Sequence, residues 1–152
     1  MYTKTVKFGG SSLADATQFQ KVAAIIRGDE ARRFVVVSAP GKRFSGDTKV
    51  TDMLYRCYDE ASAGKDFSET LSAIRTRYNG IVSELGLSLS LDGDFEDIRA
   101  SLAQKPNRDY TASRGEYLNG RVMAAYLGFE FVDPAGYVFF DEKGAFLADK
   151  TN

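Results

Sequence analysis

The feature that most constrains this chain is a run of four consecutive apolar residues, Phe34-Val35-Val36-Val37. Apolar residues on successive rather than alternate positions are typical of a parallel strand that is covered on both faces. A β-favouring run from Thr5 to Phe8 precedes it, and between the two lies a segment from Leu13 to Ile26 with apolar residues at helical spacing. This order predicts a βαβ unit with a right-handed crossover.

The rest of the chain is expected to add helices and a few short strands. Ser11 or Ser12 is expected to cap the first helix, Gly28 to end it, and Thr51 to cap the next one. With 152 residues the chain has the size of one domain, and the predicted fold class is α/β, a sandwich with at least three buried strands. Apolar spacing and turn residues predict helices over 51–61, 67–85, 92–102 and 109–127, a strand over 129–132, and a β-hairpin of 137–140 with 145–148.

The composition excludes several kinds of chemistry. The chain has no histidine and a single cysteine, Cys57, so His-based triads, imidazole bases, a structural zinc site and an internal disulfide are all excluded. The lone cysteine suits a reducing compartment, and neither a signal peptide nor a membrane-spanning run is recognisable, so we expect a cytoplasmic protein. A net charge of -1 points to neither nucleic acid nor a membrane as a partner.

The sharpest motif is Lys7-Phe8-Gly9-Gly10-Ser11-Ser12, in which a strand ends, two glycines turn the chain and a helix is expected to begin. Backbone N–H groups at such a turn, with an ammonium beside them, form a site suited to phosphate. The motif is neither a P-loop, whose lysine follows the glycines, nor a dinucleotide fingerprint. The alternative is a tight strand–helix turn that binds nothing, with Lys7 on the surface.

Two further segments carry polar groups to places where ligands bind. Ser38, the Pro40-Gly41 break and Thr51 follow the second predicted strand, and ligands of open α/β sheets bind at the carboxyl ends of strands. The alternative is an ordinary loop in which Thr51 only caps a helix.

The segment Ser113 to Arg121 places a glycine inside a predicted helix, beside a glutamate. Gly115 costs the helix up to about 1 kcal/mol relative to alanine, which is understandable if something must approach the backbone beside Glu116. The alternative is that Glu116 is a solvated carboxylate that pairs with Arg114 or Arg121.

Taken together, three ordered segments resemble the amino-terminal half of the catalytic domain of the aspartate kinases, in the amino acid kinase family: residues 7–12, residues 36–41 with 50–52, and residues 113–119. The resemblance implies a three-layer αβα sandwich of the carbamate kinase-like type, of which residues 1–152 would be the substrate-side half, without the nucleotide-binding half and regulatory domains. It implies transfer of the γ-phosphoryl group of ATP, with Mg²⁺, to the side-chain carboxylate of L-aspartate. That reaction is the first step of lysine, threonine and methionine synthesis.

The resemblance also implies which residues bind which part of the reactants. The transferring phosphoryl group and the ATP phosphates would be bound by Lys7, Gly9, Gly10 and Ser11. The aspartate would be bound by Ser38, Thr51 and, at its α-ammonium, Glu116. No metal ligand is assigned.

Elementary chemistry agrees with these roles. An aspartate carboxylate has a reference pKa near 3.9, so the nucleophile is ionised at neutral pH and needs no general base. The difficulty is an anion attacking an anion, which positive charge and correct placement relieve. Glu116 would select a free amino group, because an N-acylated substrate has no ammonium to pair with it.

Three other interpretations stay open at this point. The chain could be a kinase of glutamate, of an acylated amino acid, of carbamate or of a nucleotide, a non-catalytic module that binds ligand or assembles, or an α/β domain without a ligand. If residues 1–152 lack the nucleotide-binding half, we expect the chain alone not to turn over ATP and aspartate. We also expect an exposed apolar sheet edge and self-association into a homo-oligomer.

Overall fold

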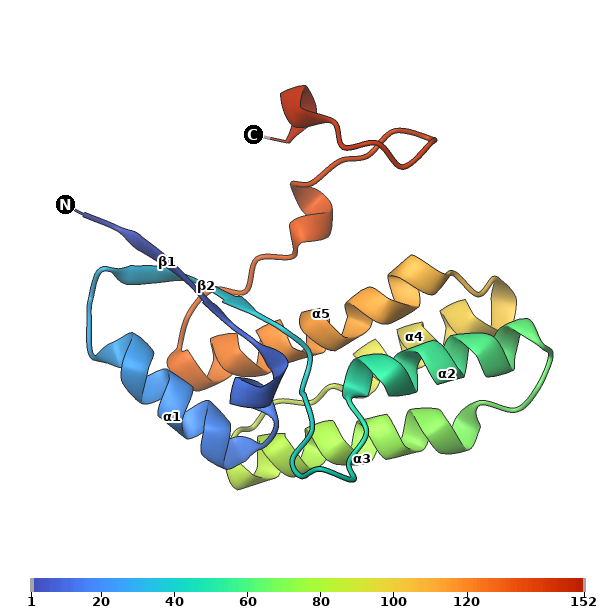
Figure 1. Cartoon of the computed structure of the whole chain (residues 1–152), viewed down its shortest axis with the longest axis horizontal. Helices are drawn as coiled ribbons and strands as arrows, with labels where there is room; N and C mark the ends of the chain where they lie inside the picture. Colours follow the sequence, from blue (N-terminus) through green and yellow to red (C-terminus); the bar gives the residue numbers. More distant parts are fainter. Residues whose placement is uncertain (1, 152) are drawn as a thin grey trace.

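The computed structural model describes residues 2–151, which form a small parallel sheet over a layer of helices (Figure 1). The elements, in order, are β1 (Lys4–Phe8), the 3-10 turn η1 (Gly10–Leu13), α1 (Ala16–Arg27), β2 (Arg32–Val37), α2 (Val50–Ser62), α3 (Ser68–Glu84), α4 (Asp92–Gln104), α5 (Arg108–Leu127), and the 3-10 turns η2 (Pro134–Gly136) and η3 (Ala148–Lys150). None of the described helices is both long and apolar enough to span a bilayer.

The predicted βαβ unit is confirmed. β1 and β2 pair in parallel, with Thr5 opposite Phe34 and Phe8 opposite Val37, and α1 connects them. The α/β class is therefore correct. The expectation of at least three buried strands is wrong for residues 2–151, where the sheet has two strands.

The expectation that β2 is covered on both faces is also wrong within residues 2–151. Val35 and Val37 pack against the helical core, whereas Phe34 is 63% exposed and Val36 is 48% exposed. Alternate residues of a strand point to opposite faces, so one face of the sheet lies on the helices and the other is open. We call this second side the open face.

The helices pack into one apolar core, as their periodicity predicts. The α3 side chains spaced three and four residues apart, Leu71, Ile74, Tyr78 and Ile81, are buried, and α3 packs mainly against α2 and α1. Its Tyr78 also contacts Phe95 of α4 and Gly115 of α5. Cys57 is buried in the same core. The positions of the helices could therefore be read from apolar spacing alone.

The helix ends were predicted less well than the helices themselves. Ser11 and Ser12 lie in η1, and the N-cap of α1 is Asp15, whose carboxylate accepts a hydrogen bond from the Gln18 N–H at 2.9 Å. Lys49, and not Thr51, precedes α2. At the other ends, Gly28 caps α1 as predicted. Gly128, in the left-handed region at φ 72°, caps α5 directly after the last residue of the predicted helix 109–127.

The chain after η2 stands away from the helical body (Figure 1), whereas Phe131, soon after α5, still packs against Tyr117 of that helix. Residues 129–132 form no strand, contrary to prediction, and the expected hairpin is reduced to one antiparallel bridge between Phe140 and Phe146. A turn at Asp141 still reverses the chain, since the Asp141 N–H donates to the Ala145 carbonyl at 2.9 Å. Strands need a neighbour to satisfy their backbone groups, and within residues 2–151 none lies beside 129–132.

Candidate active site at the carboxyl ends of the two strands

The loops that follow β1 and β2 lie at the same edge of the sheet because the two strands are parallel. They touch at two glycines, where the Gly41 N–H donates to the Gly10 carbonyl at 2.8 Å. A Cβ added at Gly10 would lie 2.8 Å from the Ala39 carbonyl oxygen, and one added at Gly41 would lie 2.6 Å from the Gly10 carbonyl carbon. Both glycines are thus required for the two loops to approach each other.

Lys7 lies next to the last residue of β1 and is exposed. Its register partner is Val36, and Val6 and Phe8 on either side of it pack toward the core, so Lys7 lies on the open face. Within residues 2–151 its ammonium forms no ion pair. Over the same residues the backbone N–H groups of Gly10 and Ser11 donate to no protein acceptor. These groups can therefore bind an anion.

The anion site differs in one respect from its prediction. The predicted source of positive potential was the start of the first α-helix, but α1 begins only at Ala16 and is capped by the carboxylate of Asp15. The N–H groups near Lys7 belong to the Gly9-Gly10 turn and to η1. An aligned α-helix dipole does not contribute at this position.

Ser38 is held by its backbone from two sides. Its N–H donates to the Phe8 carbonyl at 3.1 Å, and its carbonyl accepts a hydrogen bond from Asn119 Nδ2 on α5 at 2.6 Å. Thr51, the second residue of α2, is half-buried near the same loop, whose Pro40 carbonyl accepts the Val50 N–H at 3.1 Å. The simple capping role for Thr51 is wrong, because Lys49 is the N-cap.

Glu116 contacts the same loop from α5. Its Oε1 accepts a hydrogen bond from the Ala39 N–H at 3.3 Å, although the side chain as a whole is exposed. The alternative ion pairs are not formed, because Arg121 pairs with Asp94 and the Arg114 guanidinium lies 4.5 Å from the centre of the Tyr117 ring.

The glycine that precedes Glu116 has an explanation inside the chain. A Cβ added at Gly115 would lie 2.6 Å from the Ala39 Cβ and 3.2 Å from Leu54 Cδ1. Its carbonyl accepts a hydrogen bond from the buried Tyr78 hydroxyl at 2.7 Å, and burial, with the Glu116 charge nearby, raises the pKa of that phenol well above its usual value. The sequence correctly indicated a close approach here, and the approaching group is Ala39.

Sequence reasoning did not single out two residues that organise this edge, Arg77 and Asn119. Both are buried polar side chains at apolar phases of their helices. Arg77 on α3 binds the loops that meet at the sheet edge, and Asn119 binds the Ser38 carbonyl. The signal that could have found them is a polar residue next to a core residue, since Arg77 adjoins Tyr78 and Asn119 adjoins Leu118.

The loop between Gly41 and α2 is closed by an ion pair of its own. Arg43 Nε and Nη2 each donate to the Asp47 carboxylate at 2.8 Å, and Arg77 Nη1 lies 3.5 Å from the same carboxylate. The hydrogen bonds from Arg43 are the main reason that the pKa of Asp47 is held well below its usual range. Asp47 is therefore ionised at any pH near neutrality.

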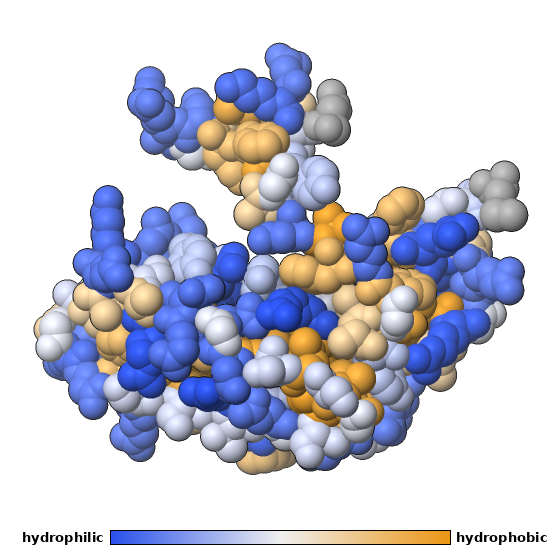
Figure 2. Space-filling model, turned by 180° about the vertical axis from the view of Figure 1, so that it is seen from behind, coloured by the Kyte–Doolittle hydropathy of each residue, from blue (hydrophilic) through white to orange (hydrophobic). Residues whose placement is uncertain are grey.

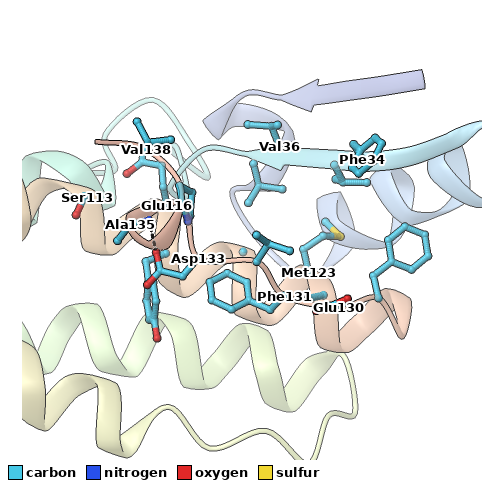
Figure 3. A pocket seen from close by; sticks show the side chains of 18 of the residues that line it. Phe34, Val36, Ser113, Glu116, Met123, Glu130, Phe131, Asp133, Ala135 and Val138 are labelled. Atoms are coloured by element: carbon cyan, nitrogen blue, oxygen red, sulfur yellow. Dashed lines mark hydrogen bonds between the residues drawn. The ribbon is translucent and has the colours of Figure 1, made fainter. Parts of the chain in front are cut away.

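A cavity of about 710 Å³ lies between β2, α5 and the segment after α5 (Figure 3). Most of its lining is apolar and includes Phe34, Val36, Met123, Phe131 and Val138. The polar and charged residues of the lining are Arg33, Ser113, Arg114, Glu116, Glu130 and Asp133. Figure 2 shows the carboxyl-terminal segment standing off from the body with apolar residues on its surface. Of the predicted site residues only Glu116 lines this cavity; the others lie at the sheet edge outside its lining.

The profile of the amino acid kinase family matches residues 3–143. The chain belongs to the amino acid kinase family. The resemblance of its three motifs to the aspartate kinases, seen in the sequence, is thereby supported at the level of the family.

Individual members of the family narrow the resemblance to aspartokinases. Over 153 residues the chain is 39% identical to aspartokinase 3 of Bacillus subtilis (strain 168), covering 97% of this chain and 34% of that protein. It is 30% identical to the chloroplastic aspartokinase 1 of Arabidopsis thaliana over 135 residues, covering 82% of this chain and 23% of that protein. The chain thus spans about a third or less of the length of these curated relatives.

Solved structures of amino acid kinases agree with the fold. The aspartate kinase of Clostridium acetobutylicum, an allosteric enzyme, superposes with a TM-score of 0.94 at 43% identity, covering 99% of this chain and 35% of that one. E. coli aspartokinase III in complex with aspartate and ADP gives a TM-score of 0.64 at 26% identity, covering 82% of this chain and 28% of that one. The arrangement of β1, β2 and the helices is therefore that of aspartate kinase structures.

Proposed function

We propose that this chain provides the aspartate side of an aspartate kinase, which transfers the γ-phosphoryl group of ATP to the side-chain carboxylate of L-aspartate. The observation that carries the proposal is the meeting of three segments at one sheet edge. Gly41 bonds to Gly10, and Glu116 bonds to Ala39, so the phosphate-binding turn, the loop after β2 and α5 adjoin one another. The likeness to aspartokinases, one of them solved with aspartate and ADP, supports this choice of substrates.

The roles follow from the charges at this edge. Lys7 and the N–H groups of the Gly9-Gly10 turn and Ser11 offer positive charge to the phosphoryl group, where negative charge accumulates in the transition state. The aspartate carboxylate is already ionised at neutral pH, so the absence of histidine from the sequence is no obstacle.

The second group of roles concerns the amino acid. Ser38 and Thr51 would contact the aspartate from the loop after β2 and the start of α2. Glu116 uses one carboxylate oxygen to hold the Ala39 N–H, and the other would bind the α-ammonium of the substrate. A free amino group would thereby be required.

The metal belongs to the nucleotide in this proposal. Within residues 2–151 no three His, Cys, Asp or Glu side chains gather in a way that could hold a metal ion. Mg²⁺ commonly binds through substrate phosphates, and it would arrive with ATP. We further propose a cytoplasmic homo-oligomer acting at the first step of lysine, threonine and methionine synthesis, with neither nucleic acid nor a membrane as partner.

The proposal is tested in a hybrid enzyme, in which this chain replaces the matching third of Bacillus subtilis aspartokinase 3. We expect the hybrid to release ADP only when aspartate is present, and the 152-residue chain alone to show no turnover. Lys7→Ala should lower kcat by about 10²- to 10³-fold, as loss of a transition-state contact does elsewhere. Lys4→Ala, on the same strand but paired with Asp29, is the matched control and should change kcat by less than about threefold.

Two results would count against this function. One is a folded hybrid without aspartate-dependent ADP release, and the other is a Lys7→Ala hybrid as active as its parent. The role of Glu116 is tested separately with N-acetylaspartate, which carries no ammonium. Glu116→Gln should reduce the preference for aspartate over N-acetylaspartate by about tenfold or more, because a neutral amide no longer pairs its charge with the ammonium of aspartate. An unchanged preference would remove that role.

A further inference from the structure

Arg77 is a buried arginine to which the proposed chemistry gives no role. The residue is 8% exposed, and its guanidinium is directed at backbone carbonyl groups. Nη1 donates to the Thr48 carbonyl at 2.8 Å, and Nη2 donates to the Ala14 carbonyl at 3.1 Å and to the Gly41 carbonyl. These carbonyls belong to two segments: Ala14 lies just before α1, and Gly41 and Thr48 lie near the two ends of the loop between β2 and α2.

These two segments carry or adjoin the residues of the candidate site. Because the Gly41 N–H donates to the Gly10 carbonyl, hydrogen bonds that fix Gly41 also restrain the phosphate-binding turn. Ala14 closes η1, which begins in that turn, and Thr48 comes shortly before Thr51. One guanidinium thus connects the phosphate side of the site to its aspartate side.

The geometry of arginine explains why this residue type is used. A guanidinium presents five N–H donors in a rigid planar fork, whereas the lysine ammonium is a compact point charge on a flexible stem. Burial of the Arg77 charge is unfavourable, and Asp47, 3.5 Å away and itself held by Arg43, offsets only part of it. Since an apolar side chain would fill the same place without burying a charge, the three carbonyls account for the arginine.

We propose that Arg77 is a positioning residue, whose guanidinium holds the Gly10–Gly41 contact and the start of α2 in one arrangement and so aligns the phosphoryl group with the aspartate carboxylate. The catalytic part of this inference rests on the proposed function. The hydrogen bonds from Arg77 to these two segments, which we call the clamp, do not depend on that function.

The clamp is tested first in the purified chain by amide hydrogen exchange. Arg77→Lys keeps the charge but loses the planar guanidinium. We expect the Gly41 N–H, which donates to the Gly10 carbonyl, and the Val50 N–H, which donates to the Pro40 carbonyl, to exchange about tenfold faster or more. Amides in the middle of α3 and α5 should change by less than about twofold. Arg75→Lys is the matched control, because Arg75 lies on the same helix and pairs with Asp92 at the surface.

A second variant keeps the test decisive if Arg77→Lys does not fold. Arg77→Met retains the apolar stem and removes the buried charge, a change that folded proteins often tolerate, and it should loosen the same two amides. Unchanged exchange at Gly41 and Val50 in a folded variant would overturn the clamp.

The catalytic part is tested in the hybrid enzyme, well below its melting temperature, so that loss of folded protein does not enter. We expect Arg77→Lys to lower kcat by about 10- to 100-fold while the KM for aspartate changes by less than about threefold, because misplacement of the reacting groups acts on the chemical step. A residue that served only stability would leave kcat per folded enzyme unchanged. If Lys7→Ala abolishes turnover while Arg77→Lys leaves kcat unchanged, the catalytic part of this inference fails and the proposed function stands. If Lys7→Ala is without effect, the proposed function fails, and the exchange experiment still decides the clamp.

Discussion

Gly115→Ala tests the contact between α5 and the loop after β2, on which the placement of Glu116 depends. The new Cβ would lie 2.6 Å from the Ala39 Cβ, where carbon atoms in contact are normally about 3.5–4.0 Å apart. The Ala39 Cβ is attached directly to the backbone, so the loop must move by about 1 Å. The Leu54 side chain, 3.2 Å from the new atom, has to yield only slightly.

The expected change in the free energy of unfolding is the difference between two opposing effects of the added methyl group. Alanine improves helix propensity over glycine by about 1 kcal/mol, and over-packing a core site costs about 1–3 kcal/mol. Gly115→Ala should therefore lower the free energy of unfolding by up to about 2 kcal/mol. Gly80→Ala is the matched control, since Gly80 lies inside α3 and an added Cβ there has no neighbour within 4 Å. That variant should gain up to about 1 kcal/mol.

The assay is urea unfolding of both variants and the parent chain, followed by circular dichroism. The two variants should differ by about 1–3 kcal/mol, or roughly 2–4 °C in Tm for each kcal/mol. In NMR spectra of the chain, the Ala39 amide resonance should also shift in Gly115→Ala, because its bond to Glu116 is displaced. If Gly115→Ala is as stable as Gly80→Ala and the Ala39 resonance does not move, the close approach is absent.

Three other predictions concern a buried thiol, the loop ion pair and the open face. Burial raises the pKa of Cys57 to about 12. The thiol should therefore resist an aromatic disulfide reagent in the folded chain and react once the chain is unfolded in urea. Rapid labelling of the native chain would contradict this. The pKa of Asp47 is lowered mainly by its hydrogen bonds from Arg43, so on acidification the unfolded chain takes up this proton at a higher pH than the folded chain does. The stability that the ionised Asp47 adds is therefore complete above about pH 5 and is lost progressively as the pH falls below about 4. Asp47→Asn should therefore flatten the decline of the urea midpoint between about pH 5 and pH 2, and an unaltered decline would show that the ion pair contributes nothing. The double variant Phe34→Ser, Val36→Ser should weaken the concentration-dependent self-association expected of an uncovered sheet face, measured by sedimentation velocity, and unchanged association would place the interface elsewhere.

Much of the fold could be predicted from the sequence because the signals that specify it are local. Apolar spacing predicts a helix over 67–85, which the structure has at Ser68–Glu84, and Gly128 ends α5 because its left-handed φ of 72° favours glycine. The βαβ unit follows from two β-favouring runs and the helix between them, since short connections and handedness leave one arrangement. The candidate motif at Lys7 could also be recognised, because a lysine, two glycines and two serines are adjacent in the chain.

Tertiary structure decided the rest, and the reason is that contact partners far apart in the sequence leave no periodic signal. The cap of α1 is Asp15, because η1 takes up the serines that a local rule would have chosen. Val36 follows the pattern of a doubly covered strand, yet exposure depends on which segment packs over it, and in residues 2–151 none does. Gly115 is required because Ala39, 76 positions earlier in the sequence, packs directly against it, and spacing along the chain does not indicate that contact. Arg77 is the extreme case, because the only explanation for a buried arginine here is the three carbonyl groups that the fold brings to its guanidinium.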